Sequence, residues 1–187
     1  MDPSAVTTPW YQQGNWPLFG AVIVLLITNG IALWKIIFQA RESLATQLRL
    51  KRIEFISQQL AEFYNPIYSM MRSNGHIFRH FGPKTFPDDE IFRQTAGENW
   101  KLLKERVILP NNKTMAGILR EKSHLLSSND DISYYLDLNN HLSMYEIFSE
   151  NPTELYKDFQ FPEGIMEHVQ TKREELVKSL NNLKEIK

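Results

Sequence analysis

Side chains that could bind a charged, ring-containing ligand are concentrated in residues 71–84, where basic and aromatic residues alternate. Basic side chains can neutralise phosphates and aromatic rings can stack on unpaired bases, a combination that single-stranded nucleic-acid sites use. No acidic residue occurs between Arg72 and Lys84. The segment is therefore predicted to contact a nucleotide or single-stranded DNA ligand through six residues: Arg72, His76, Phe78, Arg79, His80 and Lys84.

The same residues allow a structural interpretation, in which phenylalanines pin a loop to the fold and the charges lie in water. Further cations follow and could extend a basic face: Lys101, Lys104, Arg106, Lys113, Arg120 and Lys122. Glu98 and Glu105 are interspersed with them, so a mixed, solvated surface is equally natural. The net charge of −1 favours no polyanion partner, and any such contact depends on a local patch.

Histidine spacing raises the question of a metal site. His76 and His80 are four residues apart and could share a helix face, but no third nitrogen or carboxylate ligand lies at a supporting position nearby. A pair of surface histidines is the alternative, and no metal or other cofactor is predicted. Asp137 and His141 have the same spacing and are expected to form a structural hydrogen-bonded pair.

Recognisable catalytic motifs are absent from the sequence. There is no G-x-S-x-G, no glycine-rich phosphate loop, no H-E-x-x-H and no paired-carboxylate motif. The chain contains no cysteine, which excludes cysteine nucleophiles, thiolate metal sites and disulfides. We expect no catalytic residues and a protein that is not an enzyme. An enzyme of unfamiliar type, held at a membrane, is a competing interpretation.

An apolar segment near the N-terminus is predicted to anchor the chain in a membrane. Residues 18–34 carry no charge, Lys35 closes the run, and apolar residues continue to Phe38. A helix of about 20 apolar residues matches the roughly 30 Å hydrocarbon core of a bilayer, and it satisfies its own backbone groups in lipid. The sequence therefore predicts a transmembrane helix over residues 18–38, with the lipid bilayer as one partner.

The flanks of this segment predict its orientation. Residues 1–17 hold no Lys or Arg and no small-residue processing site follows the segment, which argues against a cleaved signal peptide. Basic residues flank only its C-terminal end: Lys35, Arg41, Arg49, Lys51 and Arg52. Because cytoplasmic flanks carry the excess of Lys and Arg, we expect the N-terminus outside and the remaining chain in the cytoplasm.

One face of the predicted span carries small and polar side chains within an arc of roughly 120°, at about 100° per residue. The face consists of Ala21, Leu25, Thr28, Asn29, Ala32 and Lys35. Small residues let helices approach closely, and Thr28 or Asn29 could hydrogen-bond across the interface. We expect self-association, and three arrangements stay open: a ring of helices around a pore, a dimer, or a simple anchor with a snorkelling Lys35.

The chain after the span predicts helices that end at prolines. Residues 40–64 hold no Gly or Pro and continue the span as one helix, which Asn65-Pro66 is expected to interrupt. A short helix over residues 67–72 and an ordered loop over residues 73–89 should follow, because Gly and Pro recur in that loop.

Four more helices are expected, separated by proline and capping signals. The first covers residues 89–107 with Asp88 as its N-cap, and Leu109-Pro110 resets the chain before the second, at about 115–126. Asp130 or Asp131 can cap the third, and Pro162 can open the fourth.

No segment shows convincing strand alternation, so the predicted fold class is all-α. One N-terminal transmembrane helix is expected to continue into a cytoplasmic helical bundle. The predicted parts are an extracytoplasmic tail over 1–17, the span over 18–38, a juxtamembrane helix over 39–65 and the bundle over 66–187.

The cytoplasmic part resembles a family of bacterial single-span proteins of helical build, over most of residues 50–180. The resemblance lies in Leu60-Ala61-Glu62-Phe63-Tyr64-Asn65-Pro66-Ile67-Tyr68, Trp100, Leu109-Pro110-Asn111, His124-Leu125-Leu126, His141 with Tyr145, and Phe161-Pro162. Among such proteins, the chain is similar to the membrane effectors of the Hailong anti-phage systems. Those systems pair a nucleotidyltransferase with an oligomeric ion channel that a single-stranded deoxyadenylate product controls.

This resemblance implies a homo-oligomeric ion channel or membrane-depolarising protein in the bacterial inner membrane. Its ligand would be a nucleotide or single-stranded DNA made by a partner nucleotidyltransferase, and residues 72–84 would contact it. A membrane-tethered adaptor or signalling protein, whose helical domain binds another protein, is the alternative.

Overall fold

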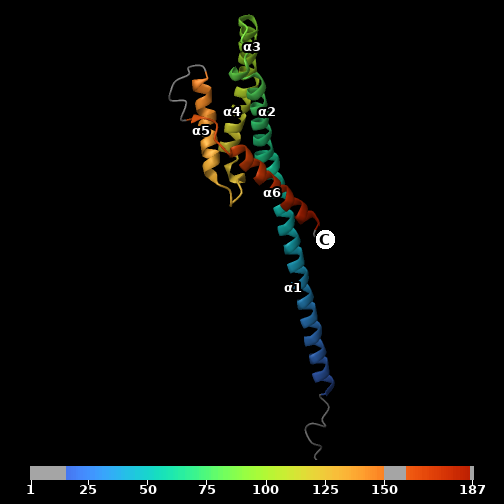
Figure 1. Cartoon of the computed structure of the whole chain (residues 1–187). Coiled ribbons are helices and arrows are strands. Elements are labelled where there is room, and N and C mark those ends of the chain that lie inside the picture. Colours follow the sequence, from blue (N-terminus) through green and yellow to red (C-terminus); the bar gives the residue numbers. More distant parts are fainter. Residues whose placement is uncertain (1–15, 150–158, 186–187) are drawn as a thin grey trace, which may run out of the picture. The chain divides into compact units, whose positions relative to one another are not determined.

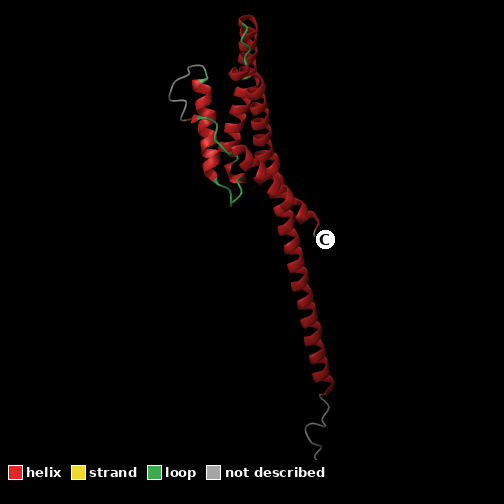
Figure 2. Ribbon diagram, viewed as in Figure 1, coloured by secondary structure: helices red, strands yellow, loops and turns green. Residues whose placement is uncertain are grey.

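The computed structural model describes residues 16–149 and 159–185. Every regular element in these ranges is helical and none is a strand (Figure 2), which confirms the all-α prediction. The α-helices are α1 (Trp16–Gln59), α2 (Asn65–Phe81), α3 (Glu90–Leu103), α4 (Leu109–Glu121), α5 (Ile132–Phe148) and α6 (Ile165–Glu185). Short turns connect them: the π-helical η2 (Leu60–Tyr64) and η4 (Lys104–Ile108), and the 3₁₀-helical η3 (Pro83–Thr85) and η5 (Ser123–Leu125).

The chain divides into two compact units, Met1–Leu50 and Lys51–Lys187. The described part of the first unit is the N-terminal part of α1, whose large apolar side chains are exposed along the predicted span. Among the described residues, this helix contains the one segment long and apolar enough to cross a membrane. Its length and composition agree with the predicted transmembrane helix.

At Pro66 and Pro110 the sequence predicts helix breaks. In the structure a π-helical turn precedes each of these prolines, and the helix continues through it. In η2, Asn65 donates its backbone N–H to the carbonyl of Leu60, and in η4 Leu109 donates to Lys104. A proline that follows an α-turn collides with the carbonyl four residues earlier, and the wider π-turn moves that carbonyl away. The predicted interruptions at Asn65-Pro66 and Leu109-Pro110 are therefore wrong, and α2 and α4 follow without a loop.

The predicted loop over residues 73–89 is wrong for its first half, because α2 continues to Phe81, whereas residues 82–89 do connect α2 to α3 as a loop with the short turn η3. Gly75 lies within that helix, with open space around the position where a side chain would begin. The helix ends where Gly82 adopts an extended conformation before Pro83, since proline disfavours the α region in the residue before it. A Cβ at Gly82 would collide with the carbonyl oxygen of Phe78, so glycine is needed there.

The starts of three later helices test the capping predictions. Asp89, not Asp88, caps α3, and its carboxylate accepts from the backbone N–H groups of Ile91 and Phe92. Asp131 caps α5, one of the two residues predicted for this role. Pro162 is not the first residue of α6, because Gly164, with φ of 79°, forms a left-handed turn that no α-helix can include.

The second unit is a helical bundle with its core between α2, α4, α5 and α6. α4 lies beside α2 and packs against α5, while α6 crosses α2 and η2 (Figure 1). Phe63 and Tyr64 of η2 are both fully buried, and the Phe63 ring contacts Tyr135 of α5. The unit also contains residues 51–65, which the sequence assigns to the juxtamembrane helix.

A buried carboxylate ties four segments of this bundle together. Asp130 accepts hydrogen bonds from the hydroxyls of Tyr64 (2.6 Å) and Tyr135 (2.9 Å) and from Nε2 of His168 (2.5 Å). The backbone N–H of Ser127 donates to the Tyr64 hydroxyl at 3.1 Å. Burial, reinforced by Asp130, raises the pKa of Tyr64 to about 12, and burial raises the pKa of Tyr135 as well.

Candidate ligand-binding site

Four of the six predicted ligand residues share the outer face of α2. At about 100° per residue, Arg72, His76, Arg79 and His80 fall on the side opposite the buried residues of this helix. All four are exposed, and the rings of His76 and His80 lie 4.3 Å apart. We call these four residues the outer face of α2.

The cations of this segment have no acidic partner, which is also true of most other Lys and Arg side chains that the structure describes, such as Lys113 and Arg120. Within the described ranges, Arg72, Arg79 and Lys84 form no ion pair, and Arg72 only approaches the ring and hydroxyl of Tyr68. An exposed cation without a counter-charge can be offered to an anionic ligand at little cost in broken contacts.

Three of the later cations that could have extended this face have partners elsewhere, whereas Arg106, Lys113 and Arg120 form no ion pair with a described residue. Lys122 bonds to Glu62 at 2.6 Å, a contact that lowers the pKa of the Glu62 carboxyl, and Lys101 lies 3.9 Å from Glu105. Lys104 donates to the carbonyl of Ser149 at 3.1 Å. These contacts correspond to the mixed surface that was the alternative interpretation of these residues.

Phe78 lies on the inner side of α2, where it belongs to the bundle. Its ring contacts Trp100 of α3 at 4.9 Å and Tyr145 of α5 at 6.0 Å. A hollow of about 480 Å³ at the end of α2 brings Phe78 together with Arg79 and Lys84. The structure therefore brings three of the predicted ligand residues to one place and leaves Arg72, His76 and His80 outside it.

A larger cavity of about 620 Å³ adjoins this hollow and shares Gly75, Phe78 and Lys84 with it. Residues of α2, α4 and α5 form most of its walls, and η3, η4, the segment before α6 and the start of α6 complete them. Most of these residues are apolar. The lining residues are Met71, Asn74, Gly75, Phe78, Lys84, Ile108, Asn112, Met115, His141, Leu142, Tyr145, Gln160, Phe161 and Met166. Its volume falls within the range of about 300–1,000 Å³ that is usual for small-molecule sites.

The polar groups of this cavity were not predicted from the sequence as ligand contacts. Asn74 and Asn112 are buried and hydrogen-bonded to each other, and His141 donates from Nδ1 to the carbonyl of Phe159 at 2.8 Å. That carbonyl replaces the expected partner, Asp137. Burial lowers the pKa of His141, so its ring is neutral at pH 7.

A signal for Asn74 was present in the sequence. It stands on the apolar stripe of α2, between Met71 and Phe78, and a polar residue in such a stripe needs either a partner or a function. The expectation of a loop over residues 73–89 concealed this stripe.

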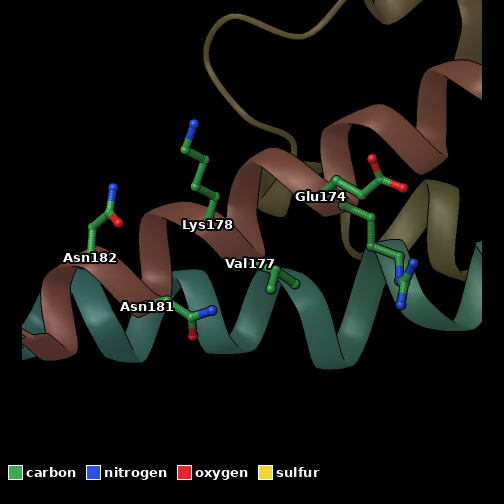
Figure 3. Close-up of a pocket in the computed structure, with 6 residues that line it drawn as sticks. Glu174, Val177, Lys178, Asn181 and Asn182 are labelled. Carbon is green, nitrogen blue, oxygen red and sulfur yellow. The ribbon is translucent and has the colours of Figure 1, made fainter.

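A third hollow, of about 430 Å³, lies on α6. Figure 3 shows Lys178 and Asn182 on one side of the helix and Val177 and Asn181 on the other. Arg173, which also lines it, holds α6 to α2: its Nε donates to Asn65, and its guanidinium lies over the Tyr68 ring. This cation has a structural role, and the hollow is not our candidate site.

The residues predicted for helix association all lie on exposed positions of α1: Ala21, Leu25, Thr28, Asn29, Ala32 and Lys35. The Thr28 hydroxyl donates within its own helix, to the carbonyls of Val24 (2.9 Å) and Leu25 (3.0 Å). Thr28 therefore needs no partner from another helix. In the described part of the chain, the amide of Asn29 has no hydrogen-bond partner.

The described residues contain no group of three or more His, Cys, Asp or Glu that could hold a metal ion. The fold and the site thus define an all-helical protein with an apolar N-terminal helix and a cavity within a separate bundle. No protein-family model, curated protein or solved structure matches the chain.

Proposed function

We propose that this chain is a single-pass membrane protein that forms a homo-oligomer and conducts ions, gated by an anionic ligand that binds its helical bundle. The apolar segment of α1 supplies the span. The asymmetry of basic residues around it favours an outside N-terminus and a cytoplasmic bundle.

Asn29 is the observation that carries the proposal. Its amide stands in an otherwise uncharged segment and lacks a hydrogen-bond partner in the described chain. A polar side chain without a partner is costly in a bilayer, and identical helices can satisfy one another's amides across a symmetric interface. Assembly of several copies around Asn29 would place a polar ring within the membrane, as a pore requires.

The ligand follows from the unpaired cations of α2 and of the hollow at its end. Arg79 and Lys84 line the hollow beside the aromatic Phe78, and Arg72 adds a third positive charge without an acidic partner on the outer face of α2. Phosphates and bases match this combination, so a nucleotide or single-stranded DNA is the ligand we propose. The ligand can bias opening only if it binds the open and closed states with different affinity.

The sequence resemblance to Hailong membrane effectors adds a biological setting to this proposal. In that setting the protein lies in the bacterial inner membrane and depolarises it during phage infection. A partner nucleotidyltransferase then makes the ligand. This setting rests on the resemblance alone.

Ionic current across a planar bilayer tests the channel. We expect purified full-length protein to carry current, and Asn29→Leu to weaken self-association roughly fivefold or more and to reduce the current accordingly, because one hydrogen-bonding side chain is lost from each interface. Ile23→Leu, on the opposite side of the helix, is the matched control and should conduct as the native protein does. The absence of current from folded native protein, with and without oligodeoxynucleotide, would contradict the proposal.

A second candidate function is a membrane-tethered adaptor. It is favoured by three exposed apolar residues of α5, Ile132 (57 % exposed), Leu136 (55 %) and Ile147 (58 %), which lie along one side of that helix. Exposed apolar residues that gather on one face favour binding of another protein. In this case the span would act only as an anchor.

A further inference from the structure

The cavity between α2, α4 and α5 is lined mainly by apolar and aromatic groups. Rings of Phe78, Tyr145 and Phe161 line it, together with the methionines Met71 and Met115. Tyr145 is almost fully buried, whereas Phe78 and Phe161 keep 41 % and 45 % of their surface exposed. Half-exposed rings at the edge of an apolar cavity offer flat surfaces for a planar ligand.

A chain of amides leaves two hydrogen-bond donors unused in this cavity. Asn111 donates to Oδ1 of Asn74 at 2.8 Å, and Nδ2 of Asn74 donates to Oδ1 of Asn112 at 2.9 Å. This sequence of bonds fixes the oxygen of Asn112 toward Asn74, so its NH₂ group must lie on the other side. Within the described residues that group has no acceptor, although Asn112 is only 6 % exposed.

Asn112 lines the cavity, and an NH₂ group without an acceptor on such a side chain can donate to a bound molecule. Lys84 is the one Lys or Arg among the residues that line the cavity, and the neighbouring hollow adds Arg79. The cavity therefore combines flat apolar walls, a neutral donor pair and a cation. A fitting ligand carries a planar ring with an acceptor and, at one side, an anionic group.

We infer that this cavity binds one base of a nucleotide, with an acceptor of the base on the Asn112 NH₂ group and the phosphate near Lys84. All nucleobases present ring nitrogens or carbonyls that can accept, and aromatic side chains stack on them. An acyl chain with a carboxylate would fill the apolar space but would leave Asn112 without an acceptor. The inference deepens the proposed function, on which it rests for the role of the ligand in gating.

Equilibrium binding to the full chain in nanodiscs tests the cavity without any measurement of current. The probes are the adenosine, guanosine, cytidine and uridine 5′-monophosphates, with inorganic phosphate, ribose 5-phosphate and decanoate for comparison. We expect at least one monophosphate to bind at least tenfold more tightly than ribose 5-phosphate or decanoate, because only a base engages both the rings and Asn112.

Two variants assign the contacts. Asn112→Asp keeps an oxygen for Asn74 but removes the NH₂ donors, and should weaken nucleotide binding about tenfold or more. Thermal unfolding of this variant measures the separate cost of a carboxylate at this buried position. Lys84→Gln removes only an exposed charge and should weaken binding several-fold, chiefly at low salt. Lys113→Gln, an equal charge change on exposed α4, is the matched control and should bind as the native protein does.

Three results would overturn the inference: no monophosphate binds, decanoate binds as well as the nucleotides, or Asn112→Asp and Lys84→Gln both bind normally. Lys84→Gln keeps the test decisive if Asn112→Asp fails to fold. Nucleotide binding without current would leave the cavity assignment intact and contradict the channel. Current without nucleotide binding would do the reverse.

Discussion

Asp130 shows at the scale of a residue how this bundle is held together. Two tyrosine hydroxyls and a histidine converge on one carboxylate, from η2, α5 and α6. A buried carboxylate is tolerated when several donors satisfy it, and removal of one donor leaves the others strained or unpaired. Tyr64 matters most to this arrangement, because its hydroxyl also accepts from the backbone of Ser127.

The phenol of Tyr64 predicts a specific loss of stability at alkaline pH. Its pKa rises from 10.0 to about 12 in the native state, so the protonated hydroxyl stabilises the fold fully below about pH 10. That contribution is lost as the pH climbs from about 10 through about 12. Tyr64→Phe should cost about 1–3 kcal/mol at pH 7 and should make unfolding less steep in this alkaline range. Urea unfolding of the full chain at a series of pH values measures both effects.

Tyr134 supplies the control for this prediction. Its ring stacks on His168 with centroids 4.4 Å apart, but its hydroxyl makes no hydrogen bond to any described residue. Tyr134→Phe should therefore leave the free energy of unfolding nearly unchanged. If the two substitutions cost the same, the hydrogen bonds around Asp130 contribute nothing measurable.

Residue-level chemistry could be predicted from the sequence only where it is local. Phe78, Arg79 and Lys84 are close in sequence, and their joint placement in one hollow follows from the end of α2. The bonds between Asn74 and the two asparagines of α4 join positions far apart in sequence. No local pattern specifies which distant helix will face Asn74. The hydrogen bonds among these asparagines could therefore be found only from the structure.

At the scale of elements, amphipathic periodicity predicted the helices correctly but placed several of their boundaries wrongly. Pro66 and Pro110 suggested breaks, because the sequence gives no sign that the preceding turn will widen to five-residue hydrogen bonds. Gly75 suggested a loop, although the helix around it is supported by the buried Met71 and Asn74. Tertiary packing decided these boundaries against local propensity.

The outer face of α2 yields a prediction at this scale. Arg72→Gln combined with Arg79→Gln removes two exposed charges that lack acidic partners. Binding of a short oligodeoxynucleotide, about ten nucleotides long, should weaken, and the slope of log K against log salt should fall by about 2. Fluorescence anisotropy at several salt concentrations measures the slope.

A matched double variant tests whether this face is specific. Lys113→Gln with Arg120→Gln removes the same charge at the same seven-residue spacing, on the exposed side of α4. It should leave the salt slope unchanged. Equal losses for the two double variants would indicate diffuse attraction and no defined nucleic-acid face on α2.

For the whole molecule, the question is whether the apolar helix conducts or only anchors. We expect replacement of residues 18–34 by an unrelated leucine-rich span to abolish current and to leave nucleotide binding intact, because the cavity lies entirely in the second unit. Binding to the nanodisc-embedded chimera and bilayer current measure the two properties separately. A control chimera that keeps Asn29 and the rest of its face should conduct.

An adaptor would respond differently. Its function in cells would survive the same replacement, and would be lost when Ile132, Leu136 and Ile147 are changed together to serine. Cell-based protection assays on the two variants therefore separate the candidates. Survival of function after replacement of the span would contradict the channel.

The π-turn at residues 60–64 sets the rotation of α2 about its helix axis. A π-turn contains one residue more than an α-turn. Deletion of that residue would rotate α2 about the helix axis by about 100° and shift it along the axis by about 1.5 Å. Met71, Asn74 and Phe78 would then swing out of their cavity while the cationic side of the helix turned inward. The extra residue of the π-turn therefore determines which side of α2 faces the core of the bundle and which side is exposed to a polyanionic ligand.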